Sequence, residues 1–160
     1  MSKTRPKDIG TATESAVVKY LRANGWPKAI RLVLQGKNDI GDISLGEDYR
    51  VVIEVKGGHA AENASDGQVQ KWLEETNRER LNGKAEMGML AMKRKGVGAS
   101  NAGNWWVVME AWQYDLLRGK PPHDVFDDIN PHLHVRFTLD HATQCLRAAG
   151  MWDGVAFSNP

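Results

Sequence analysis

The chain has 160 residues, of which 41% are hydrophobic, and this is enough for one globular domain with a buried core. A net charge of +1 does not by itself indicate a nucleic-acid binder, and the single cysteine, Cys145, excludes an internal disulfide. No apolar run is as long as a transmembrane helix, and the polar start MSKTRPKDIG lacks the apolar core of a signal peptide. We therefore expect a cytoplasmic protein that does not associate with membranes.

The first half of the chain predicts one helix followed by strands. Val17, Val18 and Leu21 form an apolar stripe at helical spacing, and Asn24-Gly25 supplies a helix end. The segments that follow are short, apolar and bounded by polar loops, which is typical of strands. We expect a helix over residues 12–24 and strands over residues 28–34, 42–45 and 50–56.

The second half predicts a helix, three strands and a last helix. Ser65 followed by Gln68 resembles a capping box, Gly83 stands where a C-cap glycine is expected, and Asp140 can cap the last helix. The inward-facing residues expected on the first of these helices are Val69, Trp72, Leu73 and Leu81. We expect helices over residues 67–82 and 141–149, and strands over residues 87–93, 105–112 and 132–139. Together these elements predict a mixed α/β domain with a central sheet.

The segment GDISLGEDYRVVIEVKGG, residues 41–58, carries charges on a strand that is otherwise apolar. Residues two apart in a strand share a face, so Glu54 and Lys56 point to the side opposite Ile53. A hairpin centred on Asp48 would set Asp42 directly opposite Glu54, with the Cβ atoms about 4.5–5.5 Å apart. Two carboxylates that close repel each other unless a cation lies between them, and Mg²⁺ binds through one or two carboxylates. The alternative is an exposed ion pair at a strand end, which the apolar strand disfavours.

Glu14 lies in line with the apolar stripe of the first helix, because Val17, Val18 and Leu21 follow it at i+3, i+4 and i+7. One interpretation is that Thr11 and Glu14 form a capping box at the start of the helix. The other is that Glu14 is a carboxylate of the candidate site. Spacing alone leaves both open.

Residues 10–58, GTATESAVVKYLRANGWPKAIRLVLQGKNDIGDISLGEDYRVVIEVKGG, resemble the PD-(D/E)xK nuclease superfamily. The shared pattern is a glutamate on the first helix, GD before apolar residues, a hairpin, IEVK and a helix. Within the superfamily, the chain is similar to the archaeal-type Holliday-junction resolvases and related proteins of actinobacterial phages. The resemblance implies a restriction-endonuclease-like α/β core, with a central mixed β-sheet flanked by helices. It places a catalytic core at residues 10–95 of a single nuclease domain, residues 1–160, with a basic N-terminal arm over 1–10 and completing strands and helix over 96–160.

The resemblance further implies a Mg²⁺-dependent phosphodiester hydrolase, with Mn²⁺ expected to substitute. The catalytic residues it implies are Glu14, Asp42, Glu54 and Lys56. The metal ligands it implies are Asp42, Glu54, the backbone carbonyl of Val55 and, as a further candidate, Glu14. Lys56 would position the attacking water or stabilise the phosphate, and Gln68 and Gln70 would support the site from the next helix. Gly41 stands where the superfamily pattern has proline, and Asp39 competes with Asp42 for the metal role.

The substrate implied is branched DNA in the form of a four-way junction, in the host cytoplasm if the protein is phage-encoded. Two symmetric cuts imply a homodimer. The basic residues expected to contact phosphates are Lys3, Arg5, Lys7, Arg31, Lys37, Lys93, Arg94 and Lys95, although short charge runs are also common as solvated ends of elements. The alternatives are a recombination or repair nuclease acting on flaps, ends or duplex, and a DNA-binding protein of this fold that does not cut.

Other chemistry-bearing residues favour structural interpretations. His132 and His134 share a strand face, but no third ligand with suitable spacing accompanies them. Cys145 lies on an apolar helix stripe, where packing is expected. The tryptophans of the WWVVMEAW segment could stack on bases, but an apolar strand places at least some of them in the core.

Overall fold

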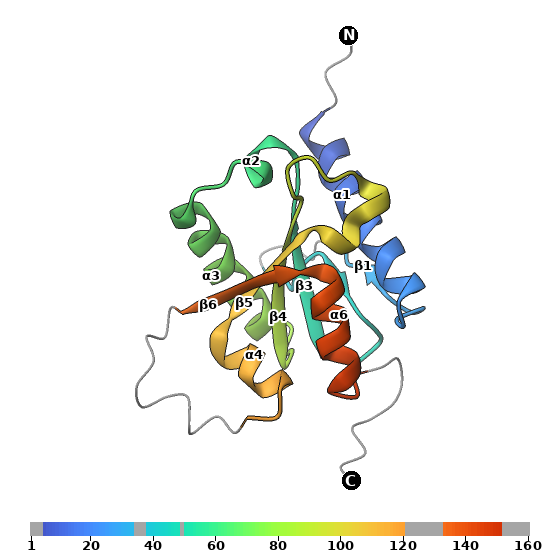
Figure 1. Ribbon diagram of the computed structural model, residues 1–160, viewed down its shortest axis with the longest axis vertical. Helices are drawn as coiled ribbons and strands as arrows, with labels where there is room; N and C mark the ends of the chain where they lie inside the picture. The colour runs from blue at the N-terminus through green and yellow to red at the C-terminus, as the bar shows by residue number, and fades with distance from the viewer. Residues whose placement is uncertain (1–4, 34–37, 49, 121–132, 152–160) are drawn as a thin grey trace.

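A six-stranded mixed sheet forms the centre of the protein (Figure 1). The computed structural model describes residues 5–33, 38–48, 50–120 and 133–151. Within these residues the strands follow one another across the sheet in chain order, and β3 and β4 form its parallel pair. The strands are β1 (Ile30–Arg31), β2 (Ile43–Ser44), β3 (Val51–Lys56), β4 (Met87–Met92), β5 (Trp106–Glu110) and β6 (His134–Thr138). The α/β fold with a central mixed sheet, expected from the sequence, is confirmed.

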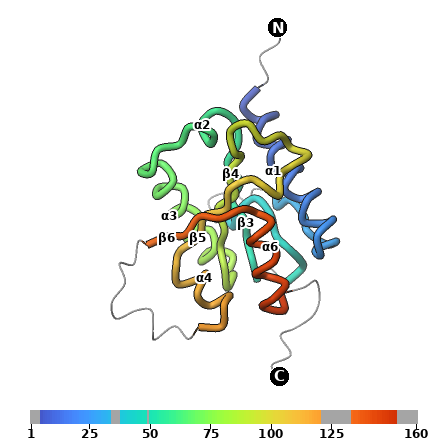
Figure 2. The backbone as a smooth tube through the Cα atoms, in the orientation of Figure 1, coloured from blue at the N-terminus to red at the C-terminus, as the bar shows by residue number. Residues whose placement is uncertain are grey.

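Helices cover both faces of the sheet, with α1 and α3 on opposite sides of β3 (Figure 1). Among the described residues, the helices are α1 (Pro6–Ala23), α2 (Gly58–Glu62), α3 (Asp66–Asn82), the 3-10 helix η1 (Ala99–Asn104), α4 (Ala111–Leu117) and α6 (Leu139–Ala148). The backbone tube shows η1 beside α1 (Figure 2), where a Cβ on Gly103 would lie 2.6 Å from the Tyr20 ring. In the described part of the chain, no helix is both long and apolar enough to span a membrane.

The core is divided into two layers by the alternation of side chains along the central strands. Ile53 belongs to the larger layer, which contains Leu21 of α1 and residues of α6. Leu90 belongs to the smaller layer, which contains Val69 of α3. Glu54 is the ladder partner of Leu90 and therefore shares its face of the sheet. The charged end of β3 thus lies on the α3 side, opposite Ile53, as predicted.

The first helix begins at Pro6, earlier than predicted. Proline is favourable at the first helical position because its missing N–H has no partner there in any case. The N-cap residue is Arg5, which makes no side-chain capping bond. Thr11 and Glu14 therefore lie inside the helix, and the capping-box interpretation is wrong. The expected basic arm, residues 1–10, is helical from Pro6 onward.

Among residues 28–33 of the strand predicted over residues 28–34, only Ile30–Arg31 form a strand, and they pair with Ser44 and Ile43; residue 34 lies outside the described residues. Val33 is 82% exposed and lies beyond this short ladder. Ile30 is 41% exposed as well, so apolar residues of this segment remain outside the core.

The strand predicted over residues 105–112 ends at Glu110, and the chain turns into α4. Gln113 explains why the helix packs here. Its side chain is 1% exposed, and its Oε1 accepts a hydrogen bond of 2.8 Å from the N–H of Gly88 at the start of β4. The ladder between β4 and β5 starts at Leu90, so α4 supplies an acceptor that the sheet does not.

The last helix is capped by Thr138 rather than by Asp140. The Thr138 Oγ1 accepts from the N–H of His141 at 3.2 Å, whereas Asp140 accepts from the Tyr20 hydroxyl at 2.9 Å. Leu139 consequently belongs to α6 and is buried. A threonine at the end of a β-strand serves both as a strand residue and as a helix cap, which favours this abrupt junction.

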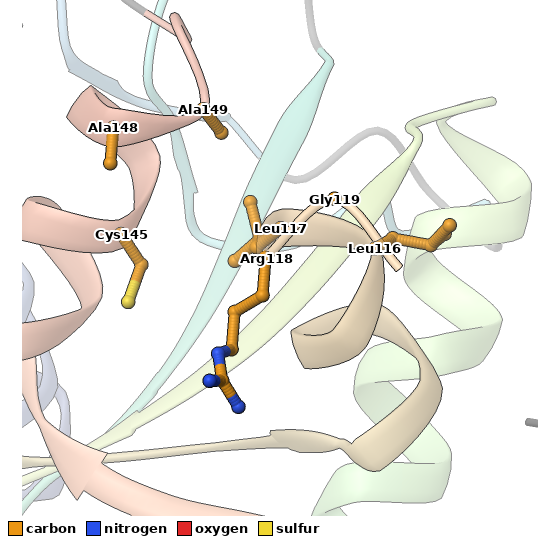
Figure 3. Close-up of a pocket in the computed structure, with 7 residues that line it drawn as sticks. All are labelled: Leu116, Leu117, Arg118, Gly119, Cys145, Ala148 and Ala149. Carbon is orange, nitrogen blue, oxygen red and sulfur yellow. The ribbon is translucent and has the colours of Figure 1, made fainter. Parts of the chain in front are cut away.

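A hollow of about 440 Å³ lies between α4 and α6 (Figure 3). Its lining residues are Leu116, Leu117, Arg118, Gly119, Cys145, Ala148 and Ala149. Cys145 is half-buried here, and burial raises the pKa of its thiol. This agrees with the packing role expected for the cysteine.

Candidate metal centre

The candidate site begins at the β2–β3 hairpin, whose register agrees with the prediction. Ser44 pairs with Val52, as expected for a hairpin centred on Asp48. The ladder has two pairs and ends at Ile43, so Asp42 lies just beyond it. Direct pairing of Asp42 with Glu54 is therefore not part of the ladder, but the charges of the two carboxylates are close enough to repel each other.

Asp42 is held by the main chain of β3. Its N–H donates to the carbonyl of Ile53 at 3.0 Å, and its Oδ2 accepts from the N–H of Val55 at 2.8 Å. Hydrogen-bonded positions in an antiparallel ladder recur at every second residue, and Leu45 donates to Val51. The N–H of Val55 therefore points toward the β2 side of β3, at a level that the β2 ladder does not reach. The Asp42 carboxylate supplies the acceptor there, which fixes it at the edge of β3.

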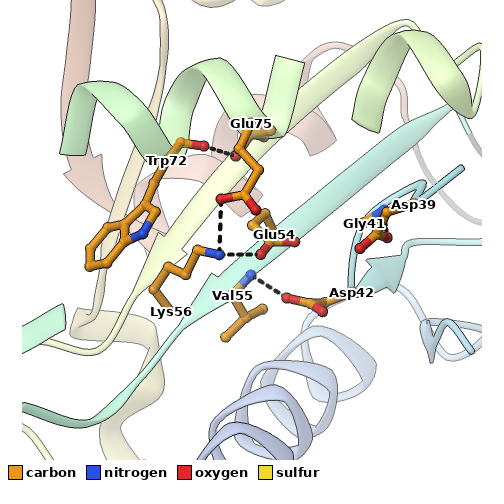
Figure 4. Close-up of polar contacts among 9 residues, drawn as sticks. Asp39, Gly41, Asp42, Glu54, Val55, Lys56, Trp72 and Glu75 are labelled. Atoms are coloured by element: carbon orange, nitrogen blue, oxygen red, sulfur yellow. Dashed lines mark hydrogen bonds and ion pairs between the residues drawn. The ribbon is translucent and has the colours of Figure 1, made fainter. Parts of the chain in front are cut away.

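Lys56 connects β3 to α3 through two carboxylates (Figure 4). Its Nζ lies 2.6 Å from Oε1 of Glu54 and 3.2 Å from Oε2 of Glu75. It also lies 5.9 Å from the centre of the Trp72 ring, a cation–π distance. Glu54 is 6% exposed, so the ammonium compensates a carboxylate that is almost removed from water. The pair is thus not the exposed strand-end ion pair of the alternative interpretation.

Two glutamates of α3 join the site without having been predicted. Ligand atoms of Glu54, Glu75 and Glu79 all lie within 4.8 Å of one another. Glu79 is 4% exposed, and its Oε2 has no hydrogen-bond partner among the described residues. A Cβ on Gly41 would lie 3.8 Å from this oxygen, which places it beside the turn that leads to Asp42.

The sequence carries a signal for Glu79, which can be interpreted once the buried face of α3 is known. Thr76 and Glu79 continue the inward stripe of Val69 and Leu73 at helical spacing, and all four are buried. The prediction that Leu81 faces inward is wrong, because it is 59% exposed. Leu81 follows Leu73 by eight residues, which turns it about 80° around the helix from the stripe. Glu79 is an acidic residue on a buried stripe, and this position indicates a carboxylate of the site.

Burial raises the pKa of three carboxyl groups in the cluster. It raises the pKa of Asp42 to about 8, with repulsion from Glu54 adding to the shift and the N–H of Val55 opposing it. It raises the pKa of Glu54 to about 7, although the charge of Lys56 lowers it. It also raises the pKa of Glu79 to about 7. A nearby cation would strongly stabilise the ionised form of these carboxyl groups.

Lys56 remains a cation at neutral pH. Burial alone would lower its pKa, but the charges of Glu54 and Glu75 outweigh burial and raise the pKa above its ordinary value. Lys56 is therefore a hydrogen-bond donor and a positive charge in this site, and it has no free lone pair with which to accept a proton.

Glu14 and Asp39 both lie at the margin of the cluster. The charge of Glu14 contributes to the raised pKa of Asp42, but its Oε2 is 2.6 Å from the Arg31 guanidinium. Asp39 accepts from the N–H of Gly41 at 3.0 Å and contributes to the raised pKa of Glu79. Arg31, expected to contact phosphate, is thus engaged by Glu14.

The two glutamines predicted to support the site serve the start of α3. The N–H of Gln68 donates to the Ser65 Oγ at 3.2 Å, which confirms the predicted N-cap. The side chain of Gln70 donates to Glu74 at 3.2 Å. Gly83 caps the other end of the helix, as predicted.

The basic cluster of residues 93–95 lies next to Lys56. The N–H of Lys93 donates to the Lys56 carbonyl at 2.9 Å, and its ammonium pairs with Glu62 at 2.9 Å. The Arg94 guanidinium lies 4.1 Å from the centre of the Trp106 ring. Lys95 lies exposed beside them, and its Nζ is 3.5 Å from Oδ1 of Asn63. Arg5 and Lys7 are exposed at the start of α1, whereas Lys3 and Lys37 lie outside the described residues.

The tryptophans of the WWVVMEAW segment differ in environment. Trp105 is 1% exposed and belongs to the core, as expected. Trp106 is half-buried beneath Arg94, and Trp112 lies on α4 beside the Arg80 guanidinium. His134 is half-buried on β6, and His132 lies outside the described residues.

The donor set of the cluster consists of carboxylate oxygens, which Mg²⁺, Mn²⁺ and Ca²⁺ prefer as ligands. The buried Oε2 of Glu79 has no partner, and the clustered carboxylates repel each other. These residues fit a divalent cation. Comparisons with protein-family models, with curated proteins and with solved structures find no match.

Proposed function

We propose that this protein is a metal-dependent endonuclease that cuts branched DNA, with the four-way junction as its substrate. The observation that carries the proposal is the meeting of Asp42, Glu54 and Lys56 at the ends of β2 and β3. These residue types occur in the order of the PD-(D/E)xK pattern that the sequence resembles. Their burial and mutual contacts support a chemical role over that of a solvated strand end.

Asp42, Glu54 and the carbonyl of Val55 would hold Mg²⁺, or Mn²⁺ in its place. When bound, such an ion polarises the scissile phosphodiester and promotes attack by water near neutral pH. Asp42 is already fixed by the N–H of Val55, so this ligand is oriented before the ion arrives. Glu14 would join the site after leaving Arg31 or would orient the ligands from its present place.

Lys56 would act as a positive charge beside the reacting phosphate. Because its pKa is raised, it stays protonated at neutral pH and stabilises the negative charge that develops in the transition state. It would also donate a hydrogen bond to the phosphate or to the attacking water. Proton removal from that water is not a role for the ammonium form.

The basic cluster of residues 93–95 would hold the DNA backbone at the C-terminal ends of β3 and β4, beside Lys56. Lys93 comes directly after Met92, the ladder partner of Lys56, and its N–H donates to the Lys56 carbonyl. The Arg94 guanidinium packs over the Trp106 ring. Contacts of this kind read phosphates and DNA shape rather than base sequence. Paired cuts in a junction require two sites, so the active species would be a homodimer.

A substrate panel tests the proposal. A labelled four-way junction, a flap and a linear duplex are incubated with the protein in Mg²⁺ or in EDTA, and the products are resolved at nucleotide resolution. The variants Asp42→Asn and Lys56→Ala are assayed beside Glu47→Gln, which removes an exposed carboxylate of the β2–β3 turn.

Symmetric nicks in the junction that require Mg²⁺, persist in Glu47→Gln and disappear in the other two variants are the expected result. Equal cutting of the linear duplex or the flap would contradict selectivity for junctions and would instead support a repair or recombination nuclease with the same chemistry. Binding of DNA without cutting of any substrate would contradict both.

A further inference from the structure

The carboxylates of the candidate site lie on both sides of Glu54. Asp42 approaches from β2, whereas Glu75 and Glu79 approach from α3. We propose that Glu54, Glu75 and Glu79 form a second divalent-cation position, separate from the one at Asp42 and shared with it through Glu54. This inference deepens the proposed function by giving the same site two ions, but the binding that it describes is measurable without DNA.

The spacing of the three carboxylates suits a single ion. Two oxygens on one ion lie no further apart than twice the metal–oxygen distance, about 4.2 Å for Mg²⁺ and about 4.6–5.2 Å for Ca²⁺. The ligand atoms of Glu54, Glu75 and Glu79 lie within 4.8 Å of one another. All three carboxylates can therefore reach one Ca²⁺ with at most a small contraction, and Mg²⁺ needs a larger one.

Glu79 supplies an independent indication that a ligand belongs here. Its side chain is 4% exposed, yet Oε2 lacks a hydrogen-bond partner in the described part of the chain. An unsatisfied buried oxygen of a charged group destabilises a fold, and a bound cation would remove that penalty. A Cβ on Gly41 would lie 3.8 Å from the same oxygen, which places this oxygen beside the turn that leads to Asp42.

The Lys56 ammonium forms ion pairs with two of the three carboxylates, where the divalent cation would bind. Its ammonium bridges Glu54 and Glu75, at 2.6 and 3.2 Å, and leaves Glu79 without a bond from it. A divalent ion at this position would take over both contacts and release Lys56. The Trp72 ring, 5.9 Å from Nζ, offers the released ammonium an alternative cation–π contact.

Calorimetric titration of Ca²⁺ and Mn²⁺ into the DNA-free protein tests the inference. Two ions are expected per chain in the wild type. Glu79→Gln and Glu75→Gln should each weaken one of them by at least about tenfold, and Asp42→Asn should weaken the other. Glu74→Gln changes an exposed carboxylate on the same helix and should keep both.

Thermal unfolding with and without Ca²⁺ supplies a second measurement on the same proteins and verifies that each variant is folded. The increase in melting temperature on adding Ca²⁺ should be smaller in Glu79→Gln than in Glu74→Gln. A single ion in the wild type, whichever variants weaken it, overturns the second position, and so do two ions that survive in both α3 variants. Two ions in a protein that cuts no DNA would leave this inference standing while the proposed function fails.

Discussion

The ammonium nitrogen of Lys56 lies 2.6 Å from Oε1 of Glu54, two residues away on the same face of β3. This contact explains how an apolar strand carries two charges at its inner end. Glu54 is nearly removed from water, and Lys56 neutralises it in place of a metal ion. In the proposed function the ammonium would both compete with a cation for these carboxylates and interact with the phosphate.

Replacement of Lys56 should therefore separate cation binding from cleavage. In Lys56→Gln the carboxylates lose their internal counter-ion, so Ca²⁺ affinity measured by calorimetry should rise by about tenfold, or about 1.4 kcal/mol. Cleavage of a junction in Mg²⁺ should fall by at least about a hundredfold, because the charge that stabilises the transition state is gone. Lys71→Gln, an exposed lysine of α3, should change neither quantity. Weaker Ca²⁺ binding in Lys56→Gln would contradict this account.

The stability of the metal-free protein should fall as the pH rises. Asp42, Glu54 and Glu79 have folded-state pKa values of about 8, about 7 and about 7, against ordinary values of 3.8 and 4.5. The folded state therefore holds these protons more tightly than the unfolded chain. Its stabilising contribution is complete below the ordinary pKa values and is lost as the pH rises through the folded values.

Thermal unfolding in EDTA measures this dependence. The melting temperature should decrease by several degrees between about pH 5 and about pH 8. Glu79→Gln removes one of the three groups and should flatten the decrease, whereas Glu74→Gln should retain it. A melting temperature that rises over this interval in the wild type would show that the carboxylates are not held as described.

Gly57 should be intolerant of a side chain, because it lies where the end of β3 meets α1. A Cβ there would lie 2.2 Å from Oγ1 and 2.9 Å from Cβ of Thr13. Gly57→Ala should lower the free energy of unfolding in urea by about 1–3 kcal/mol through overpacking. Gly67→Ala on α3 meets nothing within 4 Å and should be neutral or stabilising by up to about 1 kcal/mol. Equal stability of the two variants would contradict this packing.

Arg94 should contribute a phosphate contact. Arg94→Ala should weaken junction binding in EDTA and reduce the slope of log affinity against log salt concentration by about one. Lys120 follows α4, beyond the end of antiparallel β5, and so lies at the other end of β4 from Arg94. Lys120→Ala should leave affinity and slope unchanged. Fluorescence anisotropy with a labelled junction over a salt series distinguishes these results, and an unchanged slope in Arg94→Ala would remove Arg94 from the DNA interface.

The β2–β3 hairpin was predictable because its register is constrained by burial. Ile53 must face the larger core, and a slip of one residue would turn it to the α3 side and bring Glu54 into that core. The same constraint places Glu54 and Lys56 together. The contact of Asp42 with Val55 was not predictable in detail. It arises because β2 starts at Ile43, so that Asp42 lies outside the ladder instead of pairing with Glu54.

The contribution of α3 could not be predicted with the same precision. This helix is polar overall, so Glu75 and Glu79 resemble its solvated acids until its rotation on the sheet is known. That rotation is set by the packing of Val69 and Leu73 on Leu90, a contact between distant parts of the chain. The start of α1 at Pro6 escaped prediction for a local reason, since Thr11 offered a cap that the helix does not use.

In the proposed function, Glu54 organises a metal site that cuts branched DNA. Single-turnover cleavage of a labelled four-way junction in Mg²⁺, with Glu54→Gln compared against Glu74→Gln, tests it most directly. Glu54 is the carboxylate common to both proposed cation positions, so its loss should remove several kcal/mol of transition-state stabilisation and slow cleavage by at least about a hundredfold. Glu74→Gln should cut at the wild-type rate. Cleavage by Glu54→Gln at the wild-type rate would contradict the assignment of this site.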